Sequence, residues 1–299
     1  MNLHTFDLTI SIVSYNTCEY LRSCLDSIYR NTDALKFEVI VVDNASHDDS
    51  VQMVQSEFPQ VKIISNSDNR FFTRAHNQSL AIAQGRHFLI LNSDTEIPSE
   101  TLSRLVASLD NNPDIGAIGC RESNPDGGTE FTGSAFSTPW IEMLERTALS
   151  SVYRLRRPLW RYRMVDWSRD SSRDVDVLTD CFLMVRTELL KKFDGYDERF
   201  LLYYTENDLC LRIWQAGFRV HFEADCQYIH HSHRSVVQIG AKKYNRFYEQ
   251  DMLAYYTKHF GKAQTWLMRT GFVVAQWIVA PGLRLYRTFR FGSSTKKSR

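Results

Sequence analysis

The sequence predicts an α/β fold in which a mainly parallel central sheet is flanked by helices and followed by a helical C-terminal tail. Over the first 120 residues, short apolar runs alternate with segments of helical period. Strands that alternate with helices form parallel sheets with helices on both faces. Hydrophobic residues make up 43% of the chain and charged residues 24%, as in soluble globular proteins. The 299 residues suffice for one large domain or two small ones.

Four apolar runs in this first part predict strands. They are residues 8–16 (LTISIVSYN), 37–46 (FEVIVVDNAS), 61–66 (VKIISN) and 88–91 (FLIL). Short apolar runs that are bounded by turn-forming residues are typical of buried strands. The fourth run leads directly into Asn92, Ser93 and Asp94.

The segments between and after these runs predict helices. They are residues 17–31 (TCEYLRSCLDSIYRN), 47–58 (HDDSVQMVQSEF), 73–84 (TRAHNQSLAIAQ) and 99–112 (SETLSRLVASLDNN). In the first of them, apolar side chains recur with helical period at Tyr20, Leu21, Cys24, Leu25 and Ile28. Asp48 and Asp49 lie near the first turn of the second, where the helix dipole favours acids. Gly85 is expected to close the third.

The middle of the chain is less regular. Residues 124–139 (NPDGGTEFTGSAFSTP) are rich in Gly, Pro and Ser and predict a long loop. Residues 174–186 (DVDVLTDCFLMVR) and 226–235 (CQYIHHSHRS) are strand-like. A helix is expected from Glu206 to Gln215, ended by Gly217.

The C-terminal part of the chain is basic. From Lys262 to Arg299 there are eight Lys or Arg residues and no Asp or Glu, around an apolar run of thirteen residues at 271–283. A bilayer span needs about 20 apolar residues, so this run is too short to cross a membrane alone. A basic, tryptophan-containing amphipathic tail suits an anionic membrane surface, and a helix packed on the domain is the alternative. A second basic cluster at residues 153–163 (YRLRRPLWRYR) allows either an anionic surface or a solvated loop.

The overall charge and the cysteines narrow the class of protein. The net charge of +1 gives no field that would attract nucleic acid, so no nucleic-acid partner is expected. No two of the six cysteines form a C-x-x-C pair, which favours a reduced, intracellular chain. The first segment (MNLHTFDLTISIV) lacks a basic region and a long apolar core, so no signal peptide is expected and the location is predicted to be cytoplasmic.

Three of the predicted strands end in polar residues that would meet at one edge of a parallel sheet. They are Ser14, Tyr15 and Asn16, then Asp43 and Asn44, and then Asn92, Ser93 and Asp94. Ligands of open α/β sheets bind beyond the carboxyl ends of strands, so these side chains predict a nucleotide site. For the third group a simple turn is the alternative. No G-x-G-x-x-G follows the first strand and no G-x-x-x-x-G-K-[ST] occurs, so neither a dinucleotide fold nor a P-loop enzyme is supported.

Two further groups of residues are candidates for chemistry. Glu206 and Asp208 lie near an expected helix start, where acids stabilise the helix and where one of them would serve as a general base. His230, His231 and His233 follow the last predicted strand. Neutral imidazole binds divalent metals, and a structural role is the alternative for these histidines.

In order along the chain come the segments ISIVSYN, VIVVDNASHDDS, LILNSDTEIP, NPDGG, FDGYDERFLLYYTENDLCLRIWQAGFRV and IHHSHRS. As an ordered set they resemble family 2 glycosyltransferases, and most closely the rhamnosyltransferase-like branch that builds bacterial surface polysaccharides. The resemblance covers about Thr9 to Ser235. It implies a GT-A fold and inversion at the anomeric carbon of the transferred sugar.

The resemblance also implies roles for the residues at the strand ends. Asp43 would hold the base of a nucleotide sugar. The segment NSD occupies the place of the family's D-x-D signature, where Asp94 would contact Mg²⁺ or Mn²⁺ on the diphosphate. His230 would be a further metal ligand, with His231 as the competing choice. The same nucleotide-sugar pocket would be lined by Ser14, Tyr15, Asn16, Asn44, Asn92 and Ser93.

The catalytic acid of the family falls on Glu206, which would take the proton of the acceptor hydroxyl as a base. Asp208 would be the second acid of that catalytic motif, with a structural role. The family's Glu-Asp pair reads Thr205-Glu206 in this chain. Glu is one methylene longer than Asp, which shifts the base and still permits its role.

The chain departs from the family at other positions too. Phe71 stands where a Gly is expected, and Arg74 replaces a small residue. The segment LTDC replaces a typical SGAC, which puts Thr179 and Asp180 where Gly and Ala usually lie. These departures bear on the donor sugar and on acceptor geometry, and they leave the reaction class intact.

Together, the sequence predicts a metal-dependent, inverting hexosyltransferase in bacterial surface polysaccharide synthesis, at the inner face of the cytoplasmic membrane. It would move a sugar, with rhamnose favoured, from a dTDP- or UDP-sugar to a saccharide or lipid-linked acceptor. Residues 1–120 would form the nucleotide-sugar-binding half of the domain, residues 121–235 the acceptor-binding and catalytic half, and residues 236–299 a helical basic tail. A nucleotidyltransferase and a non-catalytic sugar-nucleotide-binding protein are the alternatives.

Overall fold

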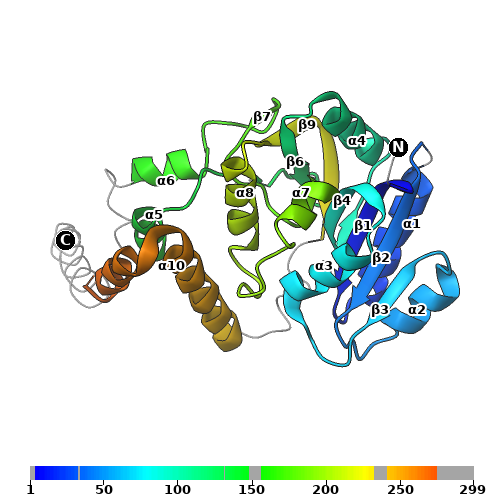
Figure 1. The fold of residues 1–299 in the computed structure, drawn as a ribbon, viewed down its shortest axis with the longest axis horizontal. Helices are drawn as coiled ribbons and strands as arrows, with labels where there is room; N and C mark the ends of the chain where they lie inside the picture. The colour runs from blue at the N-terminus through cyan, green and yellow to red at the C-terminus, as the bar shows by residue number, and fades with distance from the viewer. Residues whose placement is uncertain (1–3, 33, 131, 148–155, 232–240, 275–299) are drawn as a thin grey trace, which may run out of the picture. The chain divides into compact units, whose positions relative to one another are not determined.

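The computed structural model describes residues 4–32, 34–130, 132–147, 156–231 and 241–274 (Figure 1). The chain divides into two compact units. The first comprises Met1–Ser134 and Trp167–Met252, and the second comprises Ala135–Asp166 and Leu253–Arg299. The predicted division at residues 120 and 235 stays a prediction.

The first unit is built on one sheet of nine strands, counted over the described residues. The strands are β1 (Phe6–Ser14), β2 (Phe37–Asp43), β3 (Lys62–Ser65), β4 (Gly85–Asn92), β5 (Thr95–Glu96), β6 (Ile115–Ser123), β7 (Arg173–Asp174), β8 (Phe182–Arg186) and β9 (Arg219–His230). Their order across the sheet is β3-β2-β1-β4-β8-β6-β9-β5, and β7 pairs with β9.

The direction of the strands changes halfway across the sheet. The four strands predicted from the first part of the sequence, β1 to β4, are parallel to one another, as expected. Beyond them, β8 runs antiparallel to both β4 and β6, while β6 and β9 are parallel to each other. The complete sheet is therefore mixed, and the prediction of parallel strands holds for its first half.

Helices cover both faces of the sheet, as the alternation of strands and helices predicted (Figure 1). In chain order they are α1 (Cys18–Asn31), α2 (Ser50–Glu57), α3 (Phe71–Ile82), α4 (Thr101–Asn111), α7 (Thr187–Lys192) and α8 (Thr205–Gln215). Buried side chains of α1, α2 and α4 join one apolar cluster with side chains of the strands. Helices α3, α7 and α8 contact other strand residues outside that cluster.

Two glycines test the prediction of helix ends. Gly217 has φ of +85° and ends α8, where the N–H groups of Gly217 and Phe218 donate to carbonyls of the last turn, as predicted. Gly85 does not cap a helix, so that prediction is wrong. Helix α3 already ends at Ile82, and Gly85 opens β4 because a side chain there would overlap the backbone of Thr9.

The sequence also left one central strand unassigned. Strand β6 lies between β8 and β9, but Gly116 and Gly119 interrupt its apolar run. A Cβ atom at Gly116 would come within 2.7 Å of Ile213 and Phe218, so close helix–sheet packing requires glycine at this position.

The second unit contains α5 (Pro139–Arg146), α6 (Arg156–Tyr162) and the last part of α10 (Ala241–Val274). Helix α10 is interrupted at Gly261, which has φ of 84°. The predicted helical tail is helical up to Val274, and the remainder of its apolar run lies outside the described residues. Among the helices that the structure describes, none has both the length and the apolar character needed to cross a bilayer. All six cysteines lie in described parts of the chain and are free.

Candidate active site

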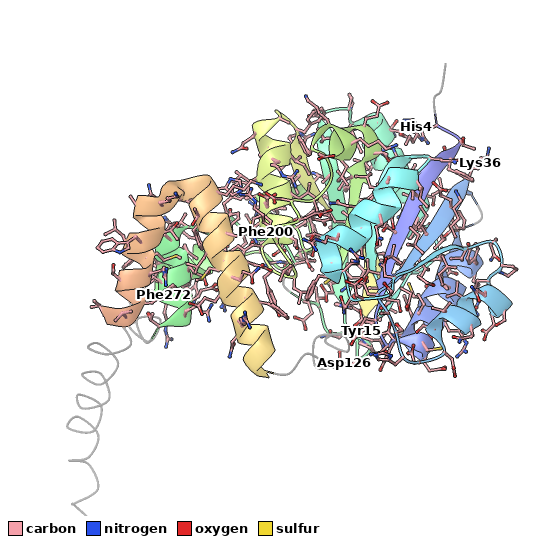
Figure 2. All side chains as sticks on the ribbon, turned by 60° about the horizontal axis from the view of Figure 1, so that its bottom comes forward. His4, Tyr15, Lys36, Asp126, Phe200 and Phe272 are labelled. Carbon is pink, nitrogen blue, oxygen red and sulfur yellow. The ribbon has the colours of Figure 1, made fainter. Side chains whose placement is uncertain are left out.

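One edge of the sheet collects most of the predicted site residues. Strands β1, β2 and β4 end there in register, with Ser14 opposite Asp43 and Val13 opposite Asn92. Because β8 is antiparallel to β4, its first residue Phe182 pairs with Leu91, and β8 therefore begins where β4 ends. Strands β6 and β9 end at the same edge. In Figure 2, Tyr15 lies at this edge and Lys36 at the opposite one.

The end of β9 meets the turn that follows β4. Asp94 is only 2% exposed, and its Oδ1 lies 3.2 Å from Nε2 of His230. The backbone N–H of His231 donates to the carbonyl of Asp94 at 2.9 Å. Thr95 donates its hydroxyl to the carbonyl of Asn92 at 2.8 Å, which closes the turn. The segment therefore forms a tight turn that carries Asp94 to the polar edge, and its part in a ligand site stays a prediction.

Glu122, near the end of β6, contacts His230 on the side of the ring opposite to Asp94. Its Oε1 lies 2.6 Å from Nδ1 of His230, and its Oε2 accepts a hydrogen bond from the hydroxyl of Tyr228 at 2.9 Å. Burial alone would lower the pKa of His230, but hydrogen bonds to Asp94 and Glu122 outweigh it and raise that pKa to about 9. The ring is therefore protonated at pH 7, and a metal would bind it only by displacing the proton on Nε2, while Glu122 on the second ring nitrogen would keep it oriented.

The geometry of Asp94 and His230 fits a divalent metal that keeps other ligands. Two ligand atoms at adjacent corners of an octahedron, with bonds of about 2.1 Å, are roughly 3.0 Å apart. The separation of 3.2 Å between Asp94 Oδ1 and His230 Nε2 is close to this value. Within the described ranges, no group of three or more His, Cys, Asp or Glu side chains is arranged to hold a metal ion. Mg²⁺ and similar ions are commonly held by one or two protein groups together with substrate phosphates.

The competing histidine lies in a different environment. His231 Nε2 is 2.8 Å from Oε1 of Glu96, and its ring packs against Tyr20 with centroids 5.6 Å apart. Of these two histidines, His230 is the one in contact with the Asp94 carboxylate. His233 lies outside the described residues.

Asp43, at the end of β2, has one buried carboxylate oxygen that accepts no hydrogen bond from the described residues. Its Oδ2 accepts a hydrogen bond from the backbone N–H of Ser46 at 2.9 Å. Its Oδ1 is buried and has no hydrogen-bond partner among the residues that the structure describes. Buried polar atoms without a partner are uncommon, so this oxygen indicates a place for an external donor.

Neighbouring polar residues shape the loops around Asp43. Asn16 has φ of 52°, and its Oδ1 accepts a hydrogen bond from the N–H of His47 at 2.7 Å. The Asn44 amide donates to the carbonyl of Phe71 at 3.0 Å and fixes the loop before α3. Phe71 itself has φ of 61°, the left-handed conformation for which glycine is favoured. Through these contacts, Asn16 and Asn44 fix the loops around the pocket that is predicted for the nucleotide sugar.

A chain of hydroxyl groups links the first loop to the Asp94 turn. The Ser14 and Thr17 hydroxyls are 3.1 Å apart, and the Thr17 and Ser93 hydroxyls are 2.9 Å apart. Thr17 was not singled out from the sequence, because it belongs to none of the quoted motifs. These contacts fix the position of Ser93 beside the end of β1.

Glu206 lies in the first turn of α8. The Thr205 hydroxyl lies 3.1 Å from its Oε2, and the Asn207 amide donates to its Oε1 at 3.0 Å. Burial raises the pKa of Glu206, while hydrogen bonds from its own backbone N–H, Thr205 and Asn207 act in the opposite direction. A partly buried carboxylate with a raised pKa at a polar edge has the properties of a general base.

The loop before α8 is held by a buried acid that sequence reasoning missed. Asp251 on α10 is fully buried, and its Oδ2 accepts hydrogen bonds from the backbone N–H groups of Leu201, Leu202 and Tyr203 at 2.9–3.0 Å. Tyr204, the next residue, has φ of 60°. Strained backbone of this kind persists only where its surroundings enforce it. Asp251 therefore fixes the segment that leads into Glu206.

Asp208 makes different contacts from Glu206. It is 1% exposed, and its Oδ2 accepts a hydrogen bond from Nε of Arg212 at 2.9 Å. Arg212 in turn donates to the carbonyl of Gly195 at 2.8 Å. The pair ties α8 to the preceding loop, which supports the structural role expected for Asp208.

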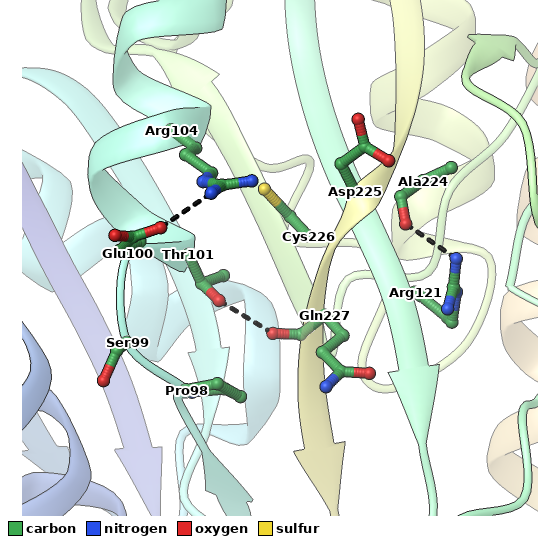
Figure 3. Close-up of a pocket in the computed structure, with 10 residues that line it drawn as sticks. All are labelled: Pro98, Ser99, Glu100, Thr101, Arg104, Arg121, Ala224, Asp225, Cys226 and Gln227. Carbon is green, nitrogen blue, oxygen red and sulfur yellow. Dashed lines mark hydrogen bonds and ion pairs between the residues drawn. The ribbon is translucent and has the colours of Figure 1, made fainter.

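A cavity of about 410 Å³ lies beside β6 and β9 (Figure 3). It is lined by Pro98, Ser99, Glu100, Thr101, Arg104, Arg121, Ala224, Asp225, Cys226 and Gln227. The cavity borders an irregularity in β9, where Cys120 pairs with Glu223 but the next residue, Arg121, pairs with Gln227. None of the predicted site residues lines it.

Comparison with known proteins agrees with this geometry. Residues 9–192 match the model of glycosyl transferase family 2. The chain is 25% identical over 228 residues to the O-antigen biosynthesis protein RfbC of Myxococcus xanthus, covering 73% of this chain and 16% of that protein. It is 23% identical over 239 residues to the N-acetylglucosaminyl-diphospho-decaprenol L-rhamnosyltransferase of Mycobacterium tuberculosis, covering 76% of this chain and 77% of that protein.

Solved structures show a similar fold at low sequence identity. Staphylococcus aureus TarS, residues 1–349, is 18% identical with a TM-score of 0.56, over 91% of this chain and 72% of that one. The mannosyltransferase PcManGT of Pyrobaculum calidifontis, in complex with GDP-Man and Mn²⁺, is 17% identical with a TM-score of 0.53, over 95% and 83% of the two chains. The fold is accordingly of the GT-A type, as predicted. With its family model, its relatives and the polar edge of its sheet in agreement, this chain belongs to glycosyl transferase family 2 and is similar to its rhamnosyltransferases.

Proposed function

We propose that this chain is a metal-dependent, inverting glycosyltransferase that moves a sugar from a nucleoside-diphosphate sugar to a saccharide or lipid-linked acceptor. One observation carries the proposal. A single edge of the sheet presents the Asp94–His230 pair, the open Oδ1 of Asp43 and the half-buried carboxylate of Glu206. These are the groups needed for a diphosphate-bound cation, a nucleobase and an acceptor hydroxyl.

Each group has a distinct part in the proposed reaction. Asp43 accepts a hydrogen bond from the base of the donor. Asp94 and His230 would hold Mg²⁺ or Mn²⁺, and the ion would supply positive charge against the departing diphosphate. Glu206 takes the proton of the acceptor hydroxyl while that oxygen attacks the anomeric carbon, opposite to the leaving group. The bond to the diphosphate breaks as the glycosidic bond forms, so the configuration inverts.

The names of the relatives guide the choice of substrates. A mycobacterial relative is called an L-rhamnosyltransferase of a diphospho-decaprenol acceptor, and the Myxococcus relative is called an O-antigen biosynthesis protein. We therefore favour dTDP-rhamnose among dTDP- and UDP-sugars, and a role in bacterial surface polysaccharide synthesis. A cytoplasmic location at the inner membrane face would bring the protein to a lipid-linked acceptor.

The second unit has the surface expected of a protein that contacts an anionic membrane. Among its described residues there are eight Lys or Arg and three acids, of which Glu142 is buried and Glu145 pairs with Arg163. Large apolar side chains are also exposed there, including Trp140, Trp160 and Trp266 at 47%, 47% and 63%. Tryptophan and basic side chains together favour the interface of an anionic bilayer.

A screen of nucleotide sugars tests the proposed function. With Mn²⁺ present, the donor should raise the melting temperature, because a ligand that binds only the folded state stabilises it. The same donor should then release its nucleoside diphosphate in the presence of acceptor. Binding without turnover would favour a non-catalytic sugar-nucleotide-binding protein, and release of pyrophosphate from a nucleoside triphosphate and sugar phosphate would favour a nucleotidyltransferase.

A further inference from the structure

Two departures from the family motif lie in direct contact in the structure. Asp180 stands where the family has Ala, and Thr205 stands where it has the Glu of its Glu-Asp pair. The Thr205 hydroxyl lies 2.6 Å from Oδ2 of Asp180 and 3.1 Å from Oε2 of Glu206. A second carboxylate therefore lies beside Glu206, contributed by the turn before β8, and Thr205 bridges the two acids.

Counting protons defines the state of this cluster. Thr205 has one hydroxyl proton, so it can donate to only one of the two carboxylates. If both acids were ionised, one of the two contacts would bring oxygen atoms together without a proton between them. A proton on Asp180 removes the conflict, because Asp180 then donates to Thr205 and Thr205 donates to Glu206. The phenol of Tyr196, 3.2 Å from Asp180 Oδ2, completes the hydrogen bonds.

The surroundings place the shared proton on Asp180 and not on Glu206. Both acids accept hydrogen bonds from their own backbone N–H groups, and Glu206 accepts a further one from the Asn207 amide where Asp180 has the Tyr196 phenol, which can also donate elsewhere; the amide favours the ionised form of Glu206. Burial, followed by the charge of Glu206, raises the pKa of Asp180 to about 8.

The thiols and the phenol around the cluster do not compete for this proton. Burial raises the pKa of the Cys181 and Cys210 thiols and of the Tyr196 phenol above their ordinary values, so these groups are neutral at pH 7. Asp251 is the remaining acid whose charge acts on Glu206. Burial raises the pKa of Asp251, and hydrogen bonds from three backbone N–H groups act in the opposite direction.

We propose that Asp180 is a positioning residue that stays protonated at neutral pH and, through Thr205, keeps Glu206 ionised and aligned. The inference rests on the proposed role of Glu206 as the base. When the acceptor hydroxyl attacks, its proton moves to Glu206 while Asp180 keeps its own. The pair holds two protons until one is released to water. Above the pH at which Asp180 ionises, the hydrogen bond to Glu206 is lost and kcat falls.

Kinetic variants test the alignment. Asp180→Asn donates to Thr205 as the protonated acid does, so kcat at pH 7 should be retained and the fall above pH 8 should disappear. Asp180→Ala and Thr205→Val should each lower kcat roughly tenfold, the effect of one lost hydrogen bond, with KM for the donor unchanged. The double variant should be no worse than either single one, and Thr205→Ser should restore kcat. Additive losses, or an unchanged alkaline limb in Asp180→Asn, would overturn the proposal.

Glu38→Gln is the matched control, because Glu38 is also a buried carboxylate that accepts from a threonine hydroxyl at 2.6 Å, here Thr9. Its pH profile should follow that of the wild type. If Glu38→Gln also loses the alkaline limb, the limb reports general stability and the proposal fails.

Urea unfolding provides a readout that does not require turnover. A carboxyl with a folded-state pKa raised from about 4 to about 8 destabilises the folded state progressively as pH rises through that window. The unfolding midpoint of Asp180→Asn, relative to wild type, should therefore increase between pH 4 and pH 8. If the difference in unfolding midpoint stays constant over this pH range, Asp180 is not protonated at neutral pH, and the proposal fails even if the enzyme is active. If the wild type turns over no nucleotide sugar, the proposed function fails while this titration still decides where the proton lies.

Discussion

Asp94 and His230 lie 136 positions apart in the chain, yet their side chains are in contact at 3.2 Å. The contact forms because β5, the short strand after Asp94, pairs with the end of β9, with Thr95 opposite His230. The sequence suggested two separate segments, a strand ending in an acid and a strand running into histidines. In the structure they bring one carboxylate oxygen and one imidazole nitrogen together.

The first prediction concerns this pair. Asp94→Asn should keep the fold and lose at least about 100-fold in activity, because the loss of a metal ligand removes several kcal/mol of charge stabilisation. Wild-type activity should vanish in EDTA and return with Mn²⁺ or Mg²⁺. Mn²⁺ binding in the presence of nucleoside diphosphate, followed by electron paramagnetic resonance, should weaken in Asp94→Asn and not in the control His231→Asn. Full activity in chelator would remove the metal from the mechanism.

The second prediction concerns the base. Glu206→Gln keeps the shape of the side chain, so kcat should fall about 10²- to 10⁴-fold while donor affinity and Tm change little. Burial raises the pKa of Glu206, and the base is lost when it is protonated. The activity of wild type should therefore fall as pH drops through a value above 4.5, the ordinary pKa of the group. Residual activity of Glu206→Gln should lack this acid limb, and near-normal kcat in this variant would place the base elsewhere.

The third prediction separates Asp208 from Glu206. Asp208→Asn breaks a buried ion pair with Arg212, which typically costs about 3–5 kcal/mol of the free energy of unfolding. At a temperature where the variant is still folded, its kcat should remain within the range of the wild type. A stable Asp208→Asn variant without activity would exchange the roles of the two acids.

The fourth prediction concerns Phe71, which has φ of 61° and packs edge-on against Phe247 with ring centroids 5.2 Å apart. Phe71→Ala loses the ring contact and keeps the unfavourable backbone conformation. Phe71→Gly loses the same contact but relieves the backbone, so it should be more stable than Phe71→Ala by about 1 kcal/mol. Equal unfolding midpoints for the two variants would show that the loop relaxes away from the left-handed conformation.

The fifth prediction concerns the second unit. The chain should bind vesicles that contain anionic lipid, and added salt should weaken the binding because it screens the basic side chains. Replacing the exposed Trp160 and Trp266 with Ala should weaken binding roughly tenfold without changing Tm. Ile82→Ala, which removes an exposed apolar side chain from the first unit, serves as the control. Equal binding of all three proteins would exclude the tryptophans from the interface.

Local patterns account for how much of the fold could be predicted. Strands β1, β2 and β4 are buried on both faces, and a buried parallel strand leaves a continuous apolar run in the sequence. The role of Gly217 could be predicted because the end of a helix depends on residues that are adjacent in the sequence. Gly85 could not be, because the restriction comes from Thr9 on another strand.

The same distinction applies to the site. Asp94, Asp43 and Glu206 lie directly after a strand or at a helix start, where local sequence indicates their location. Glu122 and Asp251 act on partners 108 and about 50 positions away, and only the register of strands and the packing of a helix bring them there. Neither acid belongs to a sequence motif that would indicate its role.

The irregularity in β9 changes which face of the sheet the later side chains of the strand occupy. Between Cys120 and Arg121, β6 advances by one residue while β9 advances from Glu223 to Gln227, so β9 stores three extra residues. An odd number exchanges the two faces of a strand. Phe222 packs against Trp167, outside the cluster around α1 and α4, whereas Cys226 and Tyr228 join that cluster.

The alternation of buried residues along β9 is unbroken, although the strand has changed sides. Straightened out, β9 would extend about 10 Å farther and direct His230 to the other face of the sheet. The meeting of His230 with Asp94 therefore depends on the count of residues 224–226 more than on their identity. Inserting or deleting one residue there should separate the pair, while most single substitutions should leave it intact.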